Sequence, residues 1–357
     1  MTRAHINRVA VAVPEHEVHD TFVRFAARLL RDRRSRLLFE RMVARSQIRN
    51  RWSCLAPAGP GCNESIDADG FYTLGRFPST GARMSRYEAE APKLAAAAVE
   101  RLALGAATRA VTHLIVTSCT GFSAPGIDLE VVRRCGLDPS VERTVIGFMG
   151  CYAAITALKL ARHIVRSEPT AKVLVLSVEL CTLHLQETED LERLLTFLLF
   201  GDGASAALVS AEPVGLSLDG FNAVLVEEAA AQITWSIRDL GFDMVLSGQV
   251  PGTISDALRA GAARVLPGLS ADAIAMWAVH PGGRTVLDAV EGAFALDPAA
   301  LAVSRAVLRD YGNMSSPTVM FVLEALLRAR APAGARGCAM AFGPGLTAET
   351  MLFSAAA

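Results

Sequence analysis

Three residues far apart in the chain have the types and settings that acyl-transfer chemistry needs. Cys151 follows the turn GFMG and opens a predicted helix over 151–168, where the field of the helix end is expected to lower the thiol pKa and favour the nucleophilic thiolate. His280 ends the predicted strand AIAMWAVH above a Pro-Gly-Gly turn, and Asn313 lies in YGNMSS before a predicted helix over 315–330. Each also suits an ordinary role, as a buried thiol, a core or surface histidine and a helix cap. Together they predict a Cys–His–Asn site that captures an acyl group as a thioester and donates hydrogen bonds to its oxygen.

Alternating strands and helices are predicted around these residues, which is typical of an α/β fold. We expect two similar halves, 1–214 and 215–357, that meet after the charged turn AEPVG, although no repeat is visible in the sequence itself. Residues 54–82, rich in Pro and Gly, are predicted to form a loop. The expected strands include 6–13, 171–180 and 221–226, and the expected helices include 87–104, 191–200, 254–265 and 283–294.

Composition excludes several classes of protein. The 35 Lys and Arg residues against 36 Asp and Glu give a net charge of −1, which argues against nucleic acid as the main partner. An apolar content of 52% excludes disorder, and no apolar run approaches the roughly 18 residues of a membrane-spanning helix. The seven cysteines include no C-x-x-C pair, so we expect no metal site, no disulfide framework, and a reducing cytoplasm as the compartment.

Arginines are concentrated between residues 24 and 51, with apolar residues at roughly helical spacing among them. One interpretation is a pair of amphipathic helices with a solvated basic face. The other is a binding site for a phosphorylated ligand.

The quoted motifs give the chain a clear resemblance. It resembles a type III polyketide synthase of the chalcone-synthase-like family, within the thiolase superfamily, from about residue 6 to 354. The motifs that carry the resemblance are GFMGCYAAITALKLA, LFGDGASAALV, WAVHPGG, YGNMSS and FGPGLTAET. The resemblance implies a thiolase-like αβαβα layered fold and a homodimer.

The resemblance also implies roles for individual residues. Cys151 matches the acyl-carrying nucleophile, and His280 and Asn313 match the pair that polarises malonyl-CoA for decarboxylation and stabilises the enolate. Phe200 and Phe242 match two gatekeeper phenylalanines between the CoA tunnel and the cavity.

Further residues are expected at the substrate. Arg41 and Arg45 match basic positions that meet CoA phosphates; a third such position falls on Leu38, so Arg36 could replace it. Ser315, in YGNMSS, is expected among the substrate-binding residues.

Cavity positions suggest the starter. Cys119 and His184 stand where plant relatives carry Thr, and Ala124 replaces a larger residue that crosses the dimer interface. The pattern is most similar to bacterial alkylpyrone and alkylresorcinol synthases, so we expect a medium-chain or long-chain fatty acyl-CoA starter, malonyl-CoA as extender and no metal or redox cofactor.

Other functions stay open. They are a naphthalene-type synthase that uses malonyl-CoA alone, with Cys119 as a candidate participant, a carrier-protein-dependent β-ketoacyl synthase, and a non-catalytic acyl-CoA-binding scaffold.

Overall fold

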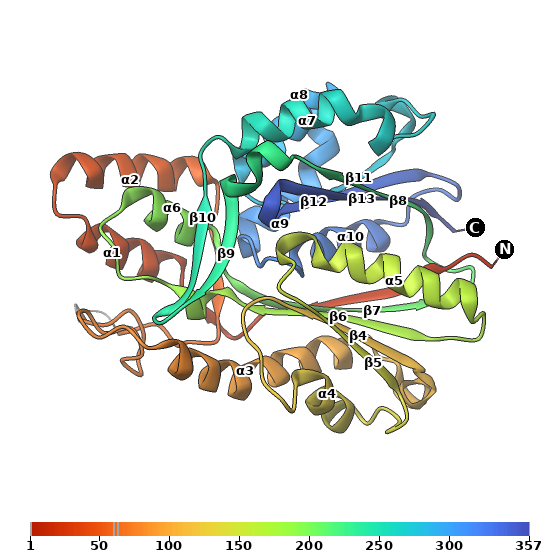
Figure 1. Cartoon of the computed structure of the whole chain (residues 1–357), viewed down its shortest axis with the longest axis horizontal. Helices are drawn as coiled ribbons and strands as arrows, with labels where there is room; N and C mark the ends of the chain where they lie inside the picture. The colour runs from red at the N-terminus through yellow and green to blue at the C-terminus, as the bar shows by residue number, and fades with distance from the viewer. Residues whose placement is uncertain (1, 60, 63, 357) are drawn as a thin grey trace.

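A nine-stranded mixed sheet runs through the computed structural model, which describes residues 2–59, 61–62 and 64–356 (Figure 1). Its strand order is β11-β12-β13-β8-β1-β7-β6-β4-β5. The strands are β1 (His5–Ala12), β4 (His113–Ser118), β5 (Glu142–Gly147), β6 (Val173–Leu180), β7 (Asp202–Ser210), β8 (Leu216–Leu225), β11 (Met276–Val279), β12 (Arg336–Gly343) and β13 (Thr347–Ala355).

The sheet consists of two groups of strands with the same pairing pattern. In the first group β4 and β6 are parallel, and β6–β7 and β7–β1 are antiparallel. In the second group β11 and β12 are parallel, and β12–β13 and β13–β8 are antiparallel. The groups join where His5 and Ile6 of β1 pair with Ser217 and Leu216 of β8. The chain therefore repeats one arrangement that its sequence does not reveal.

Helices separate and cover the two groups of strands, which gives five layers (Figure 1). Helices α7 (Val250–Val265) and α8 (Arg284–Phe294) cover the second group, and α3 (Thr80–Arg101) and α4 (Ile127–Cys135) cover the first. Between the groups lie α5 (Ala153–Ser167) and α10 (Thr318–Ala329). Helix α5 contacts β4 and β6 on one side and β12 and β13 on the other, which explains its apolar composition.

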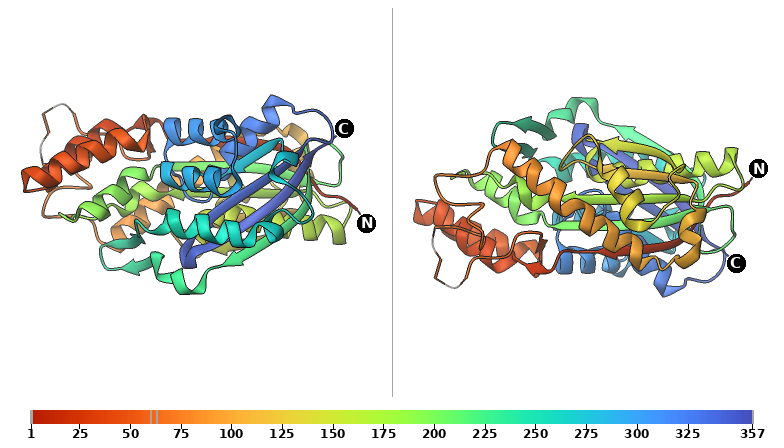
Figure 2. Two further views of the ribbon diagram at one scale, coloured as in Figure 1. Left: turned by 90° about the horizontal axis from the view of Figure 1, so that it is seen from above. Right: turned by 90° about the horizontal axis from the view of Figure 1, so that it is seen from below.

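One end of the molecule lies outside these layers. It contains α1 (His19–Leu29), α2 (Arg33–Ser46), α6 (Leu191–Leu199) and a hairpin of β9 (Ile233–Arg238) and β10 (Gly241–Leu246), and a short ladder of β2 (His16–Glu17) and β3 (Trp52–Ser53) lies nearby. Figure 2 shows α1 and α2 projecting from this end. Asp32 and Asp190 cap α2 and α6 through their carboxylates, which fixes where these helices begin.

Several elements differ from the sequence expectation. Helix α3 begins at Thr80, seven residues before the predicted start at 87. The Ser79 hydroxyl caps its first turn by accepting from the Ala82 N–H. The hairpin β9–β10, α4 and α9 (Ala302–Tyr311) were not predicted. In the described part of the chain no helix is long and apolar enough to span a bilayer.

Candidate active site

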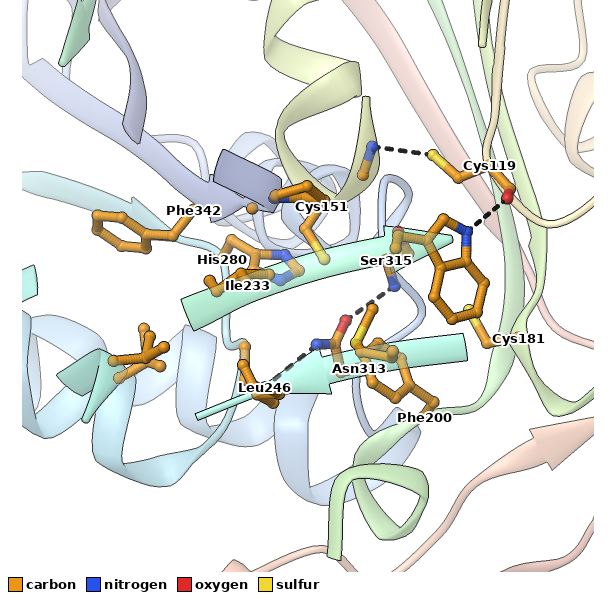
Figure 3. A pocket seen from close by; sticks show the side chains of 18 of the residues that line it. Cys119, Cys151, Cys181, Phe200, Ile233, Leu246, His280, Asn313, Ser315 and Phe342 are labelled. Carbon is orange, nitrogen blue, oxygen red and sulfur yellow. Dashed lines mark hydrogen bonds between the residues drawn. The ribbon is translucent and has the colours of Figure 1, made fainter. Parts of the chain in front are cut away.

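A largely apolar cavity lies where the two halves meet the hairpin (Figure 3). Its wall includes Cys151, His280 and Asn313, which come from three separate segments. Figure 3 shows their side chains directed into the same space.

Cys151 lies in the 3-10 turn Gly150–Tyr152, which leads directly into α5. Gly150 has φ +74°, and a Cβ there would collide with the ring of Pro344. Glycine at this position therefore allows the backbone to turn and place the sulfur, whose residue is 8% exposed, at the start of the buried helix.

His280 follows β11 directly and is 1% exposed. Its backbone N–H donates to the Met340 carbonyl (2.8 Å), which fixes the main chain. Both ring nitrogens are buried without a hydrogen-bond partner in the described part of the chain. A buried imidazole whose nitrogens are unused is available to a substrate oxygen or to the thiol.

Asn313 is held through both its backbone and its side chain. Its N–H donates to the Leu199 carbonyl (2.8 Å), and its own carbonyl accepts from the Gly201 N–H (3.0 Å). The side-chain Oδ1 accepts from the Ser315 N–H (2.8 Å) and Nδ2 donates to the Gly282 carbonyl (3.3 Å). This pattern orients the amide so that its second Nδ2 hydrogen is free to donate to a ligand.

Burial dominates the protonation of Cys151 and His280. It raises the pKa of Cys151 to about 11, against smaller opposing effects of the Ser315 and Asn313 side chains, and it lowers the pKa of His280 to about 3. The expected lowering of the thiol pKa is therefore wrong for the thiol taken alone, because removal from water outweighs the helix end. A charge on one of these groups is least costly when the other carries the opposite charge, so transfer of the thiol proton to His280 would be the least costly route to a thiolate.

Two family models match this chain. The model of the N-terminal domain of chalcone and stilbene synthases matches residues 4–213, and that of the C-terminal domain matches residues 221–357. The chain belongs to this family. It is therefore a polyketide synthase, which is a condensing acyltransferase.

Individual relatives support the assignment over most of the chain. Bisdemethoxycurcumin synthase of Oryza sativa is 37% identical over 78% of this chain and 74% of that protein. The α-pyrone synthesis polyketide synthase-like Pks18 of Mycobacterium tuberculosis is 32% identical over 99% of this chain and 91% of that protein.

Solved structures confirm the fold. PKS-I from the brown alga Ectocarpus siliculosus has a TM-score of 0.88 at 29% identity and covers 99% of both chains. The type III polyketide synthase domain of Steely1 from Dictyostelium has a TM-score of 0.90 at 21% identity, over 99% of this chain and all of that one. The thiolase-like αβαβα fold built from two similar halves is thereby confirmed.

Three other predicted residues lie on the cavity wall. The Cys119 sulfur accepts from the Gly150 N–H (3.0 Å), and burial raises its pKa well above the usual value. Ser315 is 6% exposed and has φ 57°. Phe200 is 8% exposed, directly follows α6, and forms an isolated bridge with Asn313.

The structure places Phe242 and His184 away from this wall. Their rings stack 4.2 Å apart, and the His184 imidazole donates to the Thr120 carbonyl (2.7 Å) and accepts from the Phe242 N–H (3.0 Å). Burial lowers the pKa of His184 to about 3, so it is a neutral, fully bonded core histidine. The hairpin residues that line the cavity include Trp235, Met244 and Leu246, so the wall residues of β10 are two and four positions beyond the expected one.

Ala124 is exposed and is not among the residues that line the cavity of the single chain. The expected widening of the cavity at this position therefore requires a second subunit against this face.

A wide mouth leads from the cavity to the surface, and the two share Leu246, Val250, Gly282 and Val286. Arg45 of α2 and Arg284 at the start of α8 line this mouth from opposite halves. Arg284, whose side chain also pairs with Asp288 (3.1 Å), was not predicted. Arg41 is exposed one helical turn from Arg45 but does not line the mouth.

A second cavity adjoins the first. Cys181, Phe197 and Phe200 line both, so these three side chains form the partition between them. The rest of its wall is mostly apolar and includes Phe22, Leu55 and Leu185, together with the buried Arg51. No sequence motif singled out Cys181 or Phe197, because in a sequence they look like ordinary core residues.

Proposed function

We propose that this polyketide synthase loads a medium-chain or long-chain fatty acyl-CoA on Cys151, extends it iteratively with malonyl-CoA and cyclises the product to an alkylpyrone or alkylresorcinol. The observation that carries the proposal is the apolar cavity into which Cys151, His280 and Asn313 all project, with a second apolar cavity behind a partition of three side chains. The likeness to a relative named for α-pyrone synthesis supports it.

Loading uses the Cys151–His280 pair. The thiol proton passes to His280 as sulfur attacks the acyl-CoA carbonyl, the C–S bond to CoA breaks, and the CoA thiolate leaves and takes up the proton.

Extension uses His280 and Asn313 together. Malonyl-CoA loses carbon dioxide, and the electron pair of the broken C–C bond becomes an enolate whose oxygen accepts hydrogen bonds from the imidazole N–H and the Asn313 amide. The enolate carbon then attacks the thioester carbonyl on Cys151, and the sulfur leaves as thiolate. The acyl chain, now longer by two carbons, is on CoA and can reload the cysteine.

The proposal needs coenzyme A thioesters and no metal or redox cofactor, because loss of carbon dioxide generates the carbanion. Arg45 at the mouth, and Arg41 one helical turn away, would meet the CoA phosphates. We further propose a homodimer located in the cytoplasm.

The test is product analysis by mass spectrometry with acyl-CoAs from acetyl to palmitoyl and with malonyl-CoA. We expect triketide or tetraketide pyrones or resorcinols, and kcat/KM that rises with starter length, since each buried methylene contributes up to about 0.8 kcal/mol. Cys151→Ala should abolish both the acyl adduct and the product. A single β-ketoacyl product would instead indicate a β-ketoacyl synthase, for which acyl carrier protein should be the better donor, and no product at all with either donor would indicate a scaffold.

One observation favours a second candidate. Cys119 lies on the cavity wall beside the turn that carries Cys151, so a naphthalene-type synthase that uses malonyl-CoA alone is the alternative. Three results together would favour this alternative over the fatty acyl starter. The enzyme would turn over malonyl-CoA as the only substrate, added acyl-CoA would not change the rate, and Cys119→Ser would abolish the turnover.

A further inference from the structure

Arg51 is a buried cation without a carboxylate in direct contact with its guanidinium in the described part of the chain. It is 2% exposed, and its guanidinium carbon lies 4.5 Å from the centre of the Phe22 ring. Nε donates to His19 Nδ1 (3.0 Å). Burial lowers the pKa of Arg51 to about 9, so the group is still charged at neutral pH. A charge in such a place needs a function that outweighs its desolvation.

The other hydrogen bonds of the Arg51 side chain go to the end of α6, whereas its backbone N–H donates to Glu17 Oε1 (3.2 Å). Nη1 donates to the carbonyl oxygens of Phe197 (3.0 Å) and Phe200 (2.8 Å). Carbonyls at a helix C-terminus lack partners within the helix and carry partial negative charge, so a guanidinium there both satisfies and fixes them.

The same segment, residues 197–201, holds the backbone of Asn313. The Leu199 carbonyl accepts from the Asn313 N–H (2.8 Å), and the Gly201 N–H donates to the Asn313 carbonyl (3.0 Å). Gly312, immediately before it, has φ +69°, and a Cβ there would lie 2.7 Å from the Leu199 oxygen and 2.9 Å from the Arg51 Cγ. The side chain of Arg51 thus packs against the turn that presents Asn313.

From these contacts we propose that Arg51 is a positioning residue: by holding the carbonyls of Phe197 and Phe200 it fixes the segment to which Asn313 is bonded, and so sets the place of the Asn313 amide opposite Cys151. The inference rests on the proposed function, in which that amide stabilises the enolate. Arg51 itself lines the second cavity and not the first, so it acts through Asn313.

The test separates decarboxylation from loading. Arg51→Met should lower the rate of malonyl-CoA decarboxylation by about 10²-fold, the loss expected when a catalytic group is misplaced by about 1 Å. The rate and amplitude of acyl loading on Cys151, measured by intact-protein mass spectrometry, should change less than about threefold. Arg51→Lys keeps a cation that reaches one carbonyl, so its decarboxylation rate should lie between those of Arg51→Met and the wild type.

Arg83 supplies a matched control. It is equally buried, and its Nη1 donates to the carbonyls of Leu183 and Leu185 (2.6 and 2.9 Å), but within the described part of the chain its side chain makes no hydrogen bond to the Asn313 segment. Arg83→Met should lower the Tm as Arg51→Met does and leave the ratio of decarboxylation to loading unchanged. An equal change of that ratio in both variants would overturn the proposal.

A double variant distinguishes this inference from the proposed function. In an Asn313→Ala background, Arg51→Met should cause no further loss of decarboxylation, because the group it positions is gone. If the losses of decarboxylation caused by the two substitutions multiply in the double variant, the positioning role of Arg51 is refuted, but the proposed function of Asn313 is not. If Asn313→Ala itself retains full decarboxylation, the proposed function of Asn313 fails instead.

Discussion

At the scale of single residues, we expect the charged forms of Cys151 and His280, thiolate and imidazolium, to be stable only as a pair. Burial disfavours the thiolate and the imidazolium separately, so removal of the imidazole should leave a thiol with a pKa near the raised value of about 11. In His280→Gln we expect the rate of alkylation of Cys151 by iodoacetamide to rise roughly tenfold per pH unit from pH 7 to 10. The wild type should react faster at pH 7 and depend less on pH. Peptide mass spectrometry measures the rate, and identical pH profiles would mean that His280 does not take the proton.

Trp235 is a fixed part of the cavity wall. Its indole N–H donates to the Cys119 carbonyl (2.9 Å), and its ring lies edge-on to His184 and Phe242 at 5.4 and 5.7 Å. Trp235→Ala should enlarge the cavity and shift products by at least one further extension, as measured by mass spectrometry. Met244→Leu, which conserves the volume of a neighbouring wall residue, should leave the product unchanged. An unaltered product in Trp235→Ala would mean that the hairpin does not limit chain length.

Local sequence was enough to single out three residues that line one cavity, and not enough to find the rest of its wall. Cys151, His280 and Asn313 lie next to helices or strands with a clear hydrophobic pattern, so the sequence predicted where each residue lies relative to these elements. Phe242 and Met244 are two residues apart on β10, so their side chains lie on the same face of the strand. The sequence therefore could not show which of them lines the cavity. The partition residues Cys181 and Phe197 come together through tertiary packing alone.

At the scale of elements, α2 shows which arginines can serve a ligand at the mouth. Arg34 precedes Arg45 by about three full turns and shares its side of the helix, whereas Arg36 precedes it by about two and a half turns and faces the opposite side. The expectation that Arg36 replaces the basic position at Leu38 is therefore not supported by the helix geometry, and Arg34 is the better candidate.

Arg34→Ala should raise the KM for acyl-CoA several-fold with kcat little changed, because a remote phosphate contact binds ground state and transition state alike. Arg36→Ala, equally exposed on the same helix, is the matched control and should leave KM unchanged. Steady-state kinetics with one acyl-CoA decide between them. An effect of Arg36→Ala as large as that of Arg34→Ala would indicate general attraction by a basic helix.

The elements that the sequence did not predict have a common cause. The hairpin β9–β10 and helix α9 carry mixed polar and apolar residues with no strong period, and contacts with distant segments stabilise them, such as the Trp235 bond to Cys119. Strand β6 was predicted because burial of all its residues leaves a mostly apolar sequence, and α5 because its buried residues form a long apolar face.

At the scale of the whole molecule, the two halves share one middle layer. A single core cluster contains Ile155 and Leu158 of α5 together with Met320 of α10 and Met351 of β13. We propose 1–214 and 215–357 as halves that resemble each other and do not fold alone. Expressed separately, each should lack a cooperative thermal transition by circular dichroism, and co-expression should restore one. A cooperative transition in either isolated half would show that the middle layer is not essential.

The repeated strand pairing also bears on ancestry. Cys119 directly follows β4 and His280 directly follows β11, and these strands hold the same place in their halves. Likewise Cys151 precedes α5 and Asn313 precedes α10, the two helices of the middle layer. If one half arose by gene duplication of the other, nucleophile and amide descend from one ancestral position, and the thiol of Cys119 and the imidazole of His280 from another. Division of labour between the copies would then have produced an asymmetric catalyst from a symmetric parent.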